Sequence, residues 1–64
     1  MKELDVVILA TDLPDHGLSE GAKGTIVHVF HTPYTAYEVE FPDANGATIA
    51  MVPLTADDLR PTVS

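Results

Sequence analysis

Cysteine and tryptophan are both absent from this chain of 64 residues. Without cysteine there is no disulfide bond and no thiolate cage for a metal ion. A chain of this length buries only ~60% of the surface that its unfolded form exposes. The fold must therefore rest on a compact core, or on a core shared with a partner. The composition favours a folded core, because 45% of the residues are hydrophobic and only 20% are charged.

Basic residues are scarce: three Lys and Arg stand against ten Asp and Glu, which gives a net charge of −7. Affinity for nucleic acid comes mainly from Lys and Arg that neutralise phosphates, so this charge disfavours a nucleic-acid partner. Anionic membrane surfaces are disfavoured for the same reason. A protein partner with a basic surface would instead be attracted.

Long hydrophobic runs are also missing near the N-terminus, where the apolar centre VVILA covers residues 6–10 only. A signal peptide needs a longer apolar core, and a membrane-spanning helix needs ~20 apolar residues. We therefore expect neither, and we expect a cytoplasmic protein.

Five segments of the chain predict β-strands, and in the first of them β-branched residues dominate and no helical stripe is visible. They cover residues 4–13, 25–32, 34–41, 47–54 and 60–63. The third is the clearest: Tyr37, Val39 and Phe41 alternate with Glu38 and Glu40, so one face is buried and the other faces water. Residues 14–24, rich in Gly and charge, predict a long loop.

Three local signals refine this pattern. In the second segment the apolar residues do not alternate cleanly, and a bulge would let Ile26 and Val29 both face inward. Asn45 and Gly46 predict a two-residue type I′ turn with positive φ at the glycine. Thr55 is suited to be the N-cap of a single helical turn before the last strand.

These elements predict an all-β fold, a small five-stranded SH3-like barrel with one short helical turn before the last strand, in a single domain of residues 1–64. A small barrel removes most open edges, which suits a chain with little core. A four-stranded meander with a loose C-terminus is the alternative. The residues predicted to form the core are Val7, Leu9, Ile26, Val29, Val39, Phe41 and Met51.

The stretch GAKGTIVHVF, residues 21–30, carries two glycines three positions apart. A phosphate-binding loop would need a helix N-terminus, or Lys and Ser/Thr at set positions, after the glycines. Here β-branched residues follow at once. We interpret Gly21 and Gly24 as backbone devices that permit positive φ and close approach where the chain enters a strand.

The same stretch resembles the glycine and apolar signature of KOW and other SH3-like barrels. Together, LDVVILATDLPDHGLSEGAKGTIVHVF, YEVEFPDANGAT and VPLTADDLRP resemble a family of short bacterial proteins known only as a domain of unknown function. This resemblance covers nearly the whole chain. It implies an SH3-like fold and no activity. A likeness to the barrel of the nitrile hydratase β subunit is fold-level analogy only.

Catalytic and metal chemistry find little support in the sequence. The histidines are His16, His28 and His31, and the spacing of the last two on a strand puts them on opposite faces unless a bulge intervenes. No Ser nucleophile motif occurs, and a carboxylate pair would need a cleft that so short a chain rarely encloses. We expect no catalytic site, no metal and no cofactor.

We predict that the protein is a non-enzymatic protein-interaction module that binds a basic partner through its acidic first loop. Loops on rigid barrels are where binding residues usually lie. The predicted contact residues are three carboxylates, Asp12, Asp15 and Glu20, and three anchors, His16, Leu18 and Tyr34. An antitoxin-like or immunity-like inhibitor of a basic partner and a KOW-like RNA-associated module are the alternatives. The oligomeric state stays open.

Overall fold

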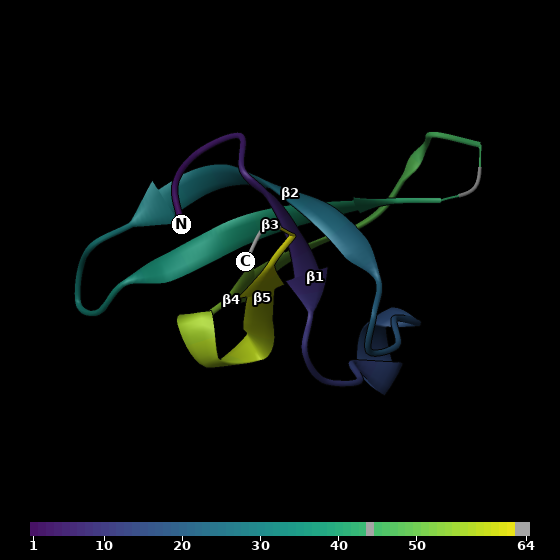
Figure 1. The fold of residues 1–64 in the computed structure, drawn as a ribbon, viewed down its shortest axis with the longest axis horizontal. Coiled ribbons are helices and arrows are strands. Elements are labelled where there is room, and N and C mark those ends of the chain that lie inside the picture. Colours follow the sequence, from purple (N-terminus) through teal and green to yellow (C-terminus); the bar gives the residue numbers. More distant parts are fainter. Residues whose placement is uncertain (44, 63–64) are drawn as a thin grey trace.

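The protein is a single curved sheet of five antiparallel strands (Figure 1). A computed structural model describes residues 1–43 and 45–62. The strands are β1 (Val6–Leu9), β2 (Lys23–Phe30), β3 (Ala36–Pro42), β4 (Thr48–Leu54) and β5 (Leu59–Pro61). Two 3-10 turns, η1 (Pro14–His16) and η2 (Ala56–Asp58), lie in the connections. The all-β class and the five strands are confirmed, and Val63, at the end of the last predicted strand, lies outside the described residues.

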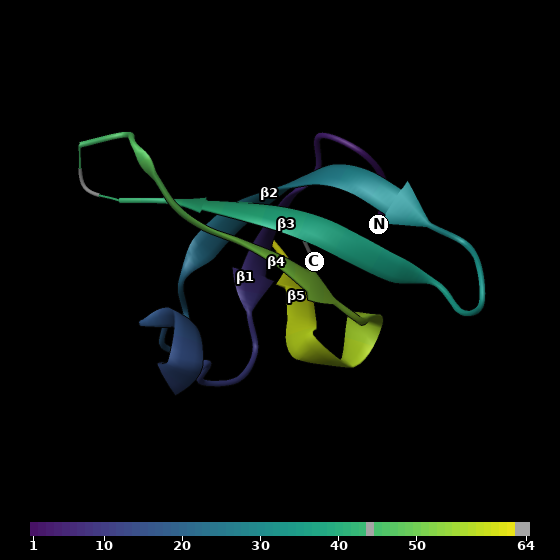
Figure 2. The same ribbon diagram turned by 180° about the vertical axis from the view of Figure 1, so that it is seen from behind.

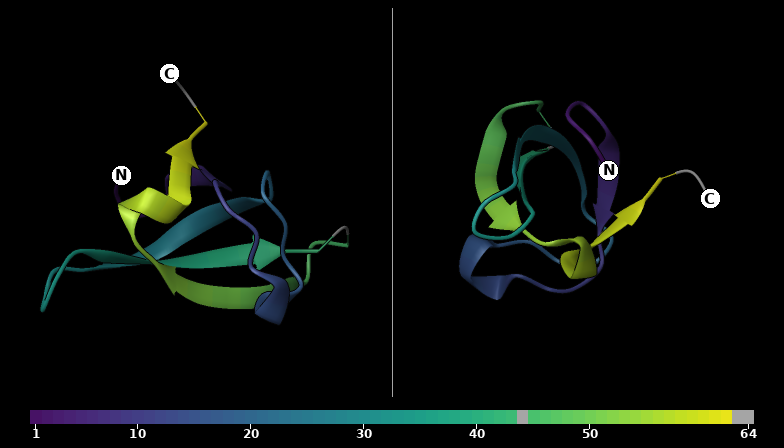
Figure 3. Two further views of the ribbon diagram at one scale, coloured as in Figure 1. Left: turned by 90° about the horizontal axis from the view of Figure 1, so that it is seen from below. Right: turned by 90° about the vertical axis from the view of Figure 1, so that its left-hand side faces the viewer.

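The sheet has the strand order β4-β3-β2-β1-β5, so the chain returns at its end to pair β5 with β1. Seen from the side, the strands curl around a common interior (Figure 3). The long β2, β3 and β4 form one continuous meander, whereas β1 and β5 are short and lie across it (Figure 2). The more specific SH3-like barrel stays a prediction.

The buried side chains line the concave side of this sheet as one cluster. They are Val7, Leu9, Leu18, Ile26, Tyr37, Val39, Phe41, Val52, Leu54 and Leu59. The prediction for Met51 is wrong, because its side chain is 52% exposed. Met51 pairs with Glu40, whereas Val52 pairs with the fully buried Val39. Successive side chains of a strand point to opposite faces, so the neighbour Val52 takes the core position.

The predicted bulge in β2 is confirmed. The pairing with β3 shifts in register between Ile26 and His28, so one extra residue is inserted there. Ile26, which precedes the bulge, is fully buried. Val29, which follows it, is half-buried against the core. The bulge therefore keeps both apolar residues on the inner face.

The two glycines of residues 21–30 serve different purposes. Gly21 has a φ of 96° just before β2, a conformation that side chains with a Cβ rarely adopt. Gly24 is buried, and a Cβ there would lie 2.8 Å from Val39 Cγ1 and 2.9 Å from the Glu40 carbonyl oxygen. Gly21 is therefore suited by its positive φ, and Gly24 by the close approach of β3 to its backbone.

The β3–β4 hairpin confirms one part of its prediction and corrects another. Gly46 has the predicted positive φ, at 86°. The Asp43 N–H donates to the Ala47 carbonyl at 2.7 Å, so the turn encloses three residues between this hydrogen-bonded pair rather than the two expected. The Asp43 carboxylate accepts hydrogen bonds from the Asn45 and Ala47 N–H groups at 2.8 and 3.0 Å. These side-chain bonds stabilise the longer loop.

We expect the substitution Gly46→Val to lower the melting temperature. A β-branched residue held at positive φ costs about 1–2 kcal/mol. In a domain of this size each kcal/mol shifts the midpoint by roughly 4–8 °C. Thermal unfolding followed by circular dichroism measures the change. Gly46→Asn is the matched control, because Asn tolerates the left-handed region and this variant should lose much less stability. Equal melting temperatures for the two variants would contradict the positive φ assigned to Gly46.

The predicted helical turn before the last strand is confirmed as η2. Thr55 is its N-cap, and its N–H and hydroxyl both donate to the Asp58 carboxylate at 3.3 Å. The Asp58 carbonyl accepts a 2.7 Å hydrogen bond from the Ala10 N–H, which joins η2 to the end of β1. The turn thereby positions Leu59 to start β5 with its side chain in the core.

Candidate functional site

Two of the three predicted carboxylates of the first loop already have partners within the chain. Asp12 Oδ1 accepts a 2.8 Å hydrogen bond from the Glu20 N–H, which joins the two ends of the loop. Glu20 forms a 3.3 Å ion pair with Arg60 of β5, and both side chains are more than half exposed. Asp12 and Glu20 therefore contribute to holding the loop on the sheet.

The other predicted residues of this loop divide between surface and core. Asp15 and His16 are exposed in η1. Leu18, predicted as a docking anchor, is only 6% exposed, so its side chain does not lie on the surface of this loop. An isolated bridge between Leu13 and Leu18 folds the loop back on itself and brings Leu18 into the core cluster. The leucine completes the small hydrophobic core rather than facing a partner.

Tyr34 is 63% exposed, but it is far from the first loop. It lies in the connection between β2 and β3, which is at the opposite end of the long axis from η1 (Figures 1 and 2). The structure therefore does not bring Tyr34 together with the acidic residues of the first loop. The single site predicted from the sequence is divided between two ends of the molecule.

The convex side of β2, β3 and β4, which we call the outer face, gathers a different set of side chains. Residues that pair directly across antiparallel strands share a face. One row across the sheet is Val6, Thr25, Glu40 and Met51. The next rows are His28, Glu38 and Pro53, and then Phe30 and Ala36.

Exposed apolar and ring side chains border this face on both sides. Phe30 on β2 is 41% exposed and Met51 on β4 is 52% exposed. His28 and Phe30 stack edge to face, with ring centroids 4.6 Å apart and planes at 72°. Pro53 on β4 is also exposed, and it lies across Glu38 from His28. Three apolar side chains, Phe30, Pro53 and Met51, are thus exposed on one face of the sheet.

The centre of the outer face is negatively charged. Glu38 and Glu40 lie half-buried on β3 between the two bordering strands. Within residues 1–43 and 45–62 the ion pair is that of Arg60 with Glu20, and neither Glu38 nor Glu40 takes part in one. The face therefore presents two carboxylates that form no ion pair with the described residues, and they lie among Thr25, His28 and the apolar Met51 and Pro53. Such a surface suits a ligand that carries positive charge and apolar area together.

Sequence reasoning missed this face although part of the signal was visible. The alternation of Glu38 and Glu40 with the core residues of β3 placed both carboxylates on the water-facing side. What the pattern did not give was the position of Phe30, His28 and Met51 beside them. That position depends on the bulge in β2 and on the register of β4.

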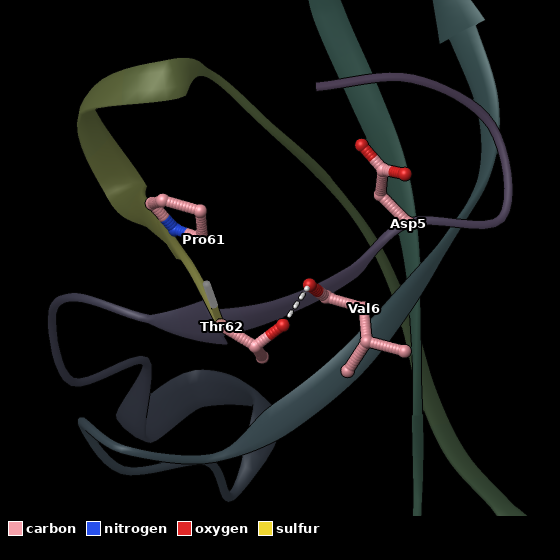
Figure 4. Close-up of a pocket in the computed structure, with 4 residues that line it drawn as sticks. All are labelled: Asp5, Val6, Pro61 and Thr62. Atoms are coloured by element: carbon pink, nitrogen blue, oxygen red, sulfur yellow. Dashed lines mark hydrogen bonds between the residues drawn. The ribbon is translucent and has the colours of Figure 1, made fainter. Parts of the chain in front are cut away.

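A shallow hollow of about 320 Å³ lies between the start of β1 and the end of β5 (Figure 4), and it shares Val6 with the first row of the outer face. Its lining consists of Asp5, Val6, Pro61 and Thr62. The Thr62 hydroxyl donates to the Val6 carbonyl at 3.3 Å, and Asp5 Oδ2 accepts from the Lys2 N–H at 3.0 Å. These polar groups therefore bond within the chain, and among residues 1–43 and 45–62 no set of groups converges on the hollow as a catalytic site requires.

In the part of the chain that the structure describes, no three His, Asp or Glu side chains come close enough together to hold a metal ion. Over the same residues, no helix has the length and apolar character to cross a bilayer.

The chain belongs to the family described as Domain of unknown function (DUF4926), whose model matches residues 3–61. The resemblance seen in the sequence to a domain of unknown function is thereby confirmed, whereas its bacterial origin and SH3-like barrel stay predictions. Comparisons with curated proteins and with solved structures gave no match.

Proposed function

We propose that the protein is a non-enzymatic interaction module that binds a basic protein partner through the outer face. The observation that carries the proposal is the pair of half-buried carboxylates, Glu38 and Glu40, bordered by exposed Phe30 and Met51. The net charge of −7 supports it, because a strongly acidic domain attracts cationic partners at long range.

Charge and apolar area have separate tasks in this binding mode. An exposed ion pair contributes only ~0–1 kcal/mol, so two carboxylates alone do not hold a partner. Their effect is on the rate of encounter and on orientation. The affinity comes from apolar anchors that lose contact with water, and the large exposed side chains Phe30 and Met51 supply that area.

The outer face suits this function better than the first loop does. A partner that took Asp12 or Glu20 would compete with the Glu20 N–H and with Arg60, which already occupy these carboxylates. The anchor expected there, Leu18, is buried. Asp15 remains free to add to the long-range attraction without forming the contact itself.

The test compares two charge-matched double variants. Glu38→Gln with Glu40→Gln removes two charges from the outer face, and Asp15→Asn with Asp57→Asn removes two exposed charges from the two 3-10 turns. The basic partner is captured with the unaltered protein and identified by mass spectrometry. Its association rate is then measured for each variant at several salt concentrations.

We expect the outer-face variant to associate several-fold more slowly and with a flatter salt dependence than the matched control, because proximity strengthens charge pairing. Phe30→Ala should mainly speed dissociation, by about fivefold or more if the ring is an anchor worth over ~1 kcal/mol. Equal kinetics for the two double variants would show that the acidity acts only through net charge and that the outer face is not the site.

The antitoxin-like or immunity-like inhibitor is a narrower form of the same proposal. The same acidic and apolar face supports it, because the basic active site of an enzyme is one kind of cationic surface. Loss of the captured partner's enzymatic activity on binding separates the inhibitor from a simple adaptor. An RNA-associated module has less support, since one of the three basic residues, Arg60, is paired with Glu20.

A further inference from the structure

We infer that the segment bound by the outer face is an extended chain with cationic side chains at alternate positions, lying along β3. The inference rests on the proposed function and specifies the partner's local structure. It starts from the two carboxylates, Glu38 and Glu40, which are two residues apart on one strand and on one side of it.

The spacing of the carboxylates matches an extended ligand. Residues two apart on an antiparallel strand are separated by about 6.8 Å along its axis. A partner segment in the same conformation repeats its own side chains at that distance. Cations at positions i and i+2 of such a segment therefore face Glu38 and Glu40 together, and the residue between them points away.

The bordering strands favour an extended chain over a helix. Glu38 and Glu40 are half-buried, whereas His28 and Phe30 on one side and Met51 on the other are exposed. The two bordering strands are about 9.6 Å apart, twice the strand spacing. A helix with its side chains is about 10–12 Å across, so it would rest on the exposed borders above the carboxylates. A single extended chain is narrower, about one strand spacing of 4.8 Å, and it approaches the carboxylates more closely than a helix does.

The chemistry of the borders selects arginine for the position facing Glu38. Glu38 pairs across the strands with His28, whose ring stacks on Phe30 at 4.6 Å. A guanidinium group binds a carboxylate through two parallel hydrogen bonds, and its flat face also stacks on aromatic rings. Lysine offers only the charge. The position facing Glu40 lies beside Thr25 and Met51, so either cation suits it.

Two peptides of identical composition test the inference. Acetyl-Thr-Arg-Val-Arg-Val-Thr-amide has alternate arginines, and acetyl-Thr-Arg-Arg-Val-Val-Thr-amide has adjacent ones. Each is titrated into the ¹⁵N-labelled protein, and amide shifts are followed by NMR. We expect the alternating peptide to bind at least fivefold more tightly and to shift the amides of β2, β3 and β4. The variant Glu38→Gln with Glu40→Gln should remove the difference, whereas Asp15→Asn with Asp57→Asn should keep it.

The outcomes separate this inference from the proposed function. If both peptides shift the outer face with equal affinity, the extended alternating segment is wrong and the proposed function stands. If neither peptide shifts that face, the inference is also wrong. The proposed function is then judged by the association kinetics of the two double variants with the basic partner, which do not depend on the peptides.

Discussion

Val39→Asp is expected to unfold the protein. Val39 is fully buried at the centre of the sheet, between Ile26 on β2 and Val52 on β4. The described residues include no buried polar or charged side chain that could pair with a carboxylate there. An unpaired charge in an apolar core costs several kcal/mol, comparable to the total stability of ~5–15 kcal/mol of small proteins. The well-dispersed amide NMR spectrum of a folded domain should collapse.

Met51→Asp provides the matched comparison. Met51 is on the neighbouring strand β4, one residue before the partner of Val39. Its side chain is on the outer face and 52% exposed. This variant should keep a dispersed spectrum, and its free energy of unfolding should fall by less than ~1 kcal/mol, as is usual for surface substitutions. A dispersed spectrum for Val39→Asp, or a collapsed one for Met51→Asp, would mean that the two faces of the sheet are wrongly assigned.

Gly24→Val is expected to be the second most damaging change. The ideal Cβ at this position lies 2.8 Å from Val39 Cγ1, and 2.9 Å from both Phe41 Cδ1 and the Glu40 carbonyl oxygen. All three atoms belong to β3, so a side chain at Gly24 must push β2 and β3 apart. Gly24→Ala should cost about 1–3 kcal/mol, as overpacking of a core does, and the larger valine more. Melting temperatures and urea unfolding curves give both values.

A double-mutant cycle shows whether contact is the cause. Val39→Ala removes the Cγ1 atom nearest to the added Cβ. In the Val39→Ala background Gly24→Ala should therefore cost measurably less than it does alone, a coupling of more than ~0.5 kcal/mol. Strictly additive costs would indicate that Gly24 is required for some reason other than its distance from Val39.

Much of the fold could be predicted because it depends on local patterns. The strict alternation in β3 fixed its buried face, since side chains of a strand point alternately to each side. In the segment of β2 the apolar residues do not alternate cleanly, and this irregularity indicated the bulge after Ile26. Gly46 and Thr55 were recognisable because few residue types suit a positive φ or an N-cap. Each signal lies within a few residues of the feature it predicts.

The candidate site could be predicted much less well. Met51 and Val52 are both apolar neighbours in a strand, and composition does not say which of them faces inward. Leu18 was expected at the surface because it lies in a loop, but the bridge to Leu13 turns it into the core. At both positions the pairing register with another segment decides which side chain is buried. A shift of the register by one residue moves each side chain to the opposite face.

The sequence by itself determined the class of the fold, the acidic charge and membership of the family, because strand periodicity, ionisable residues and motif order are properties of the chain read in one dimension. Only the tertiary structure decided which side chains share a surface. It separated Tyr34 from the first loop, and it placed Phe30 and Met51 beside Glu38 and Glu40. The physical reason is that a binding face is assembled across strands, by the bulge and by the pairing of segments far apart in the chain.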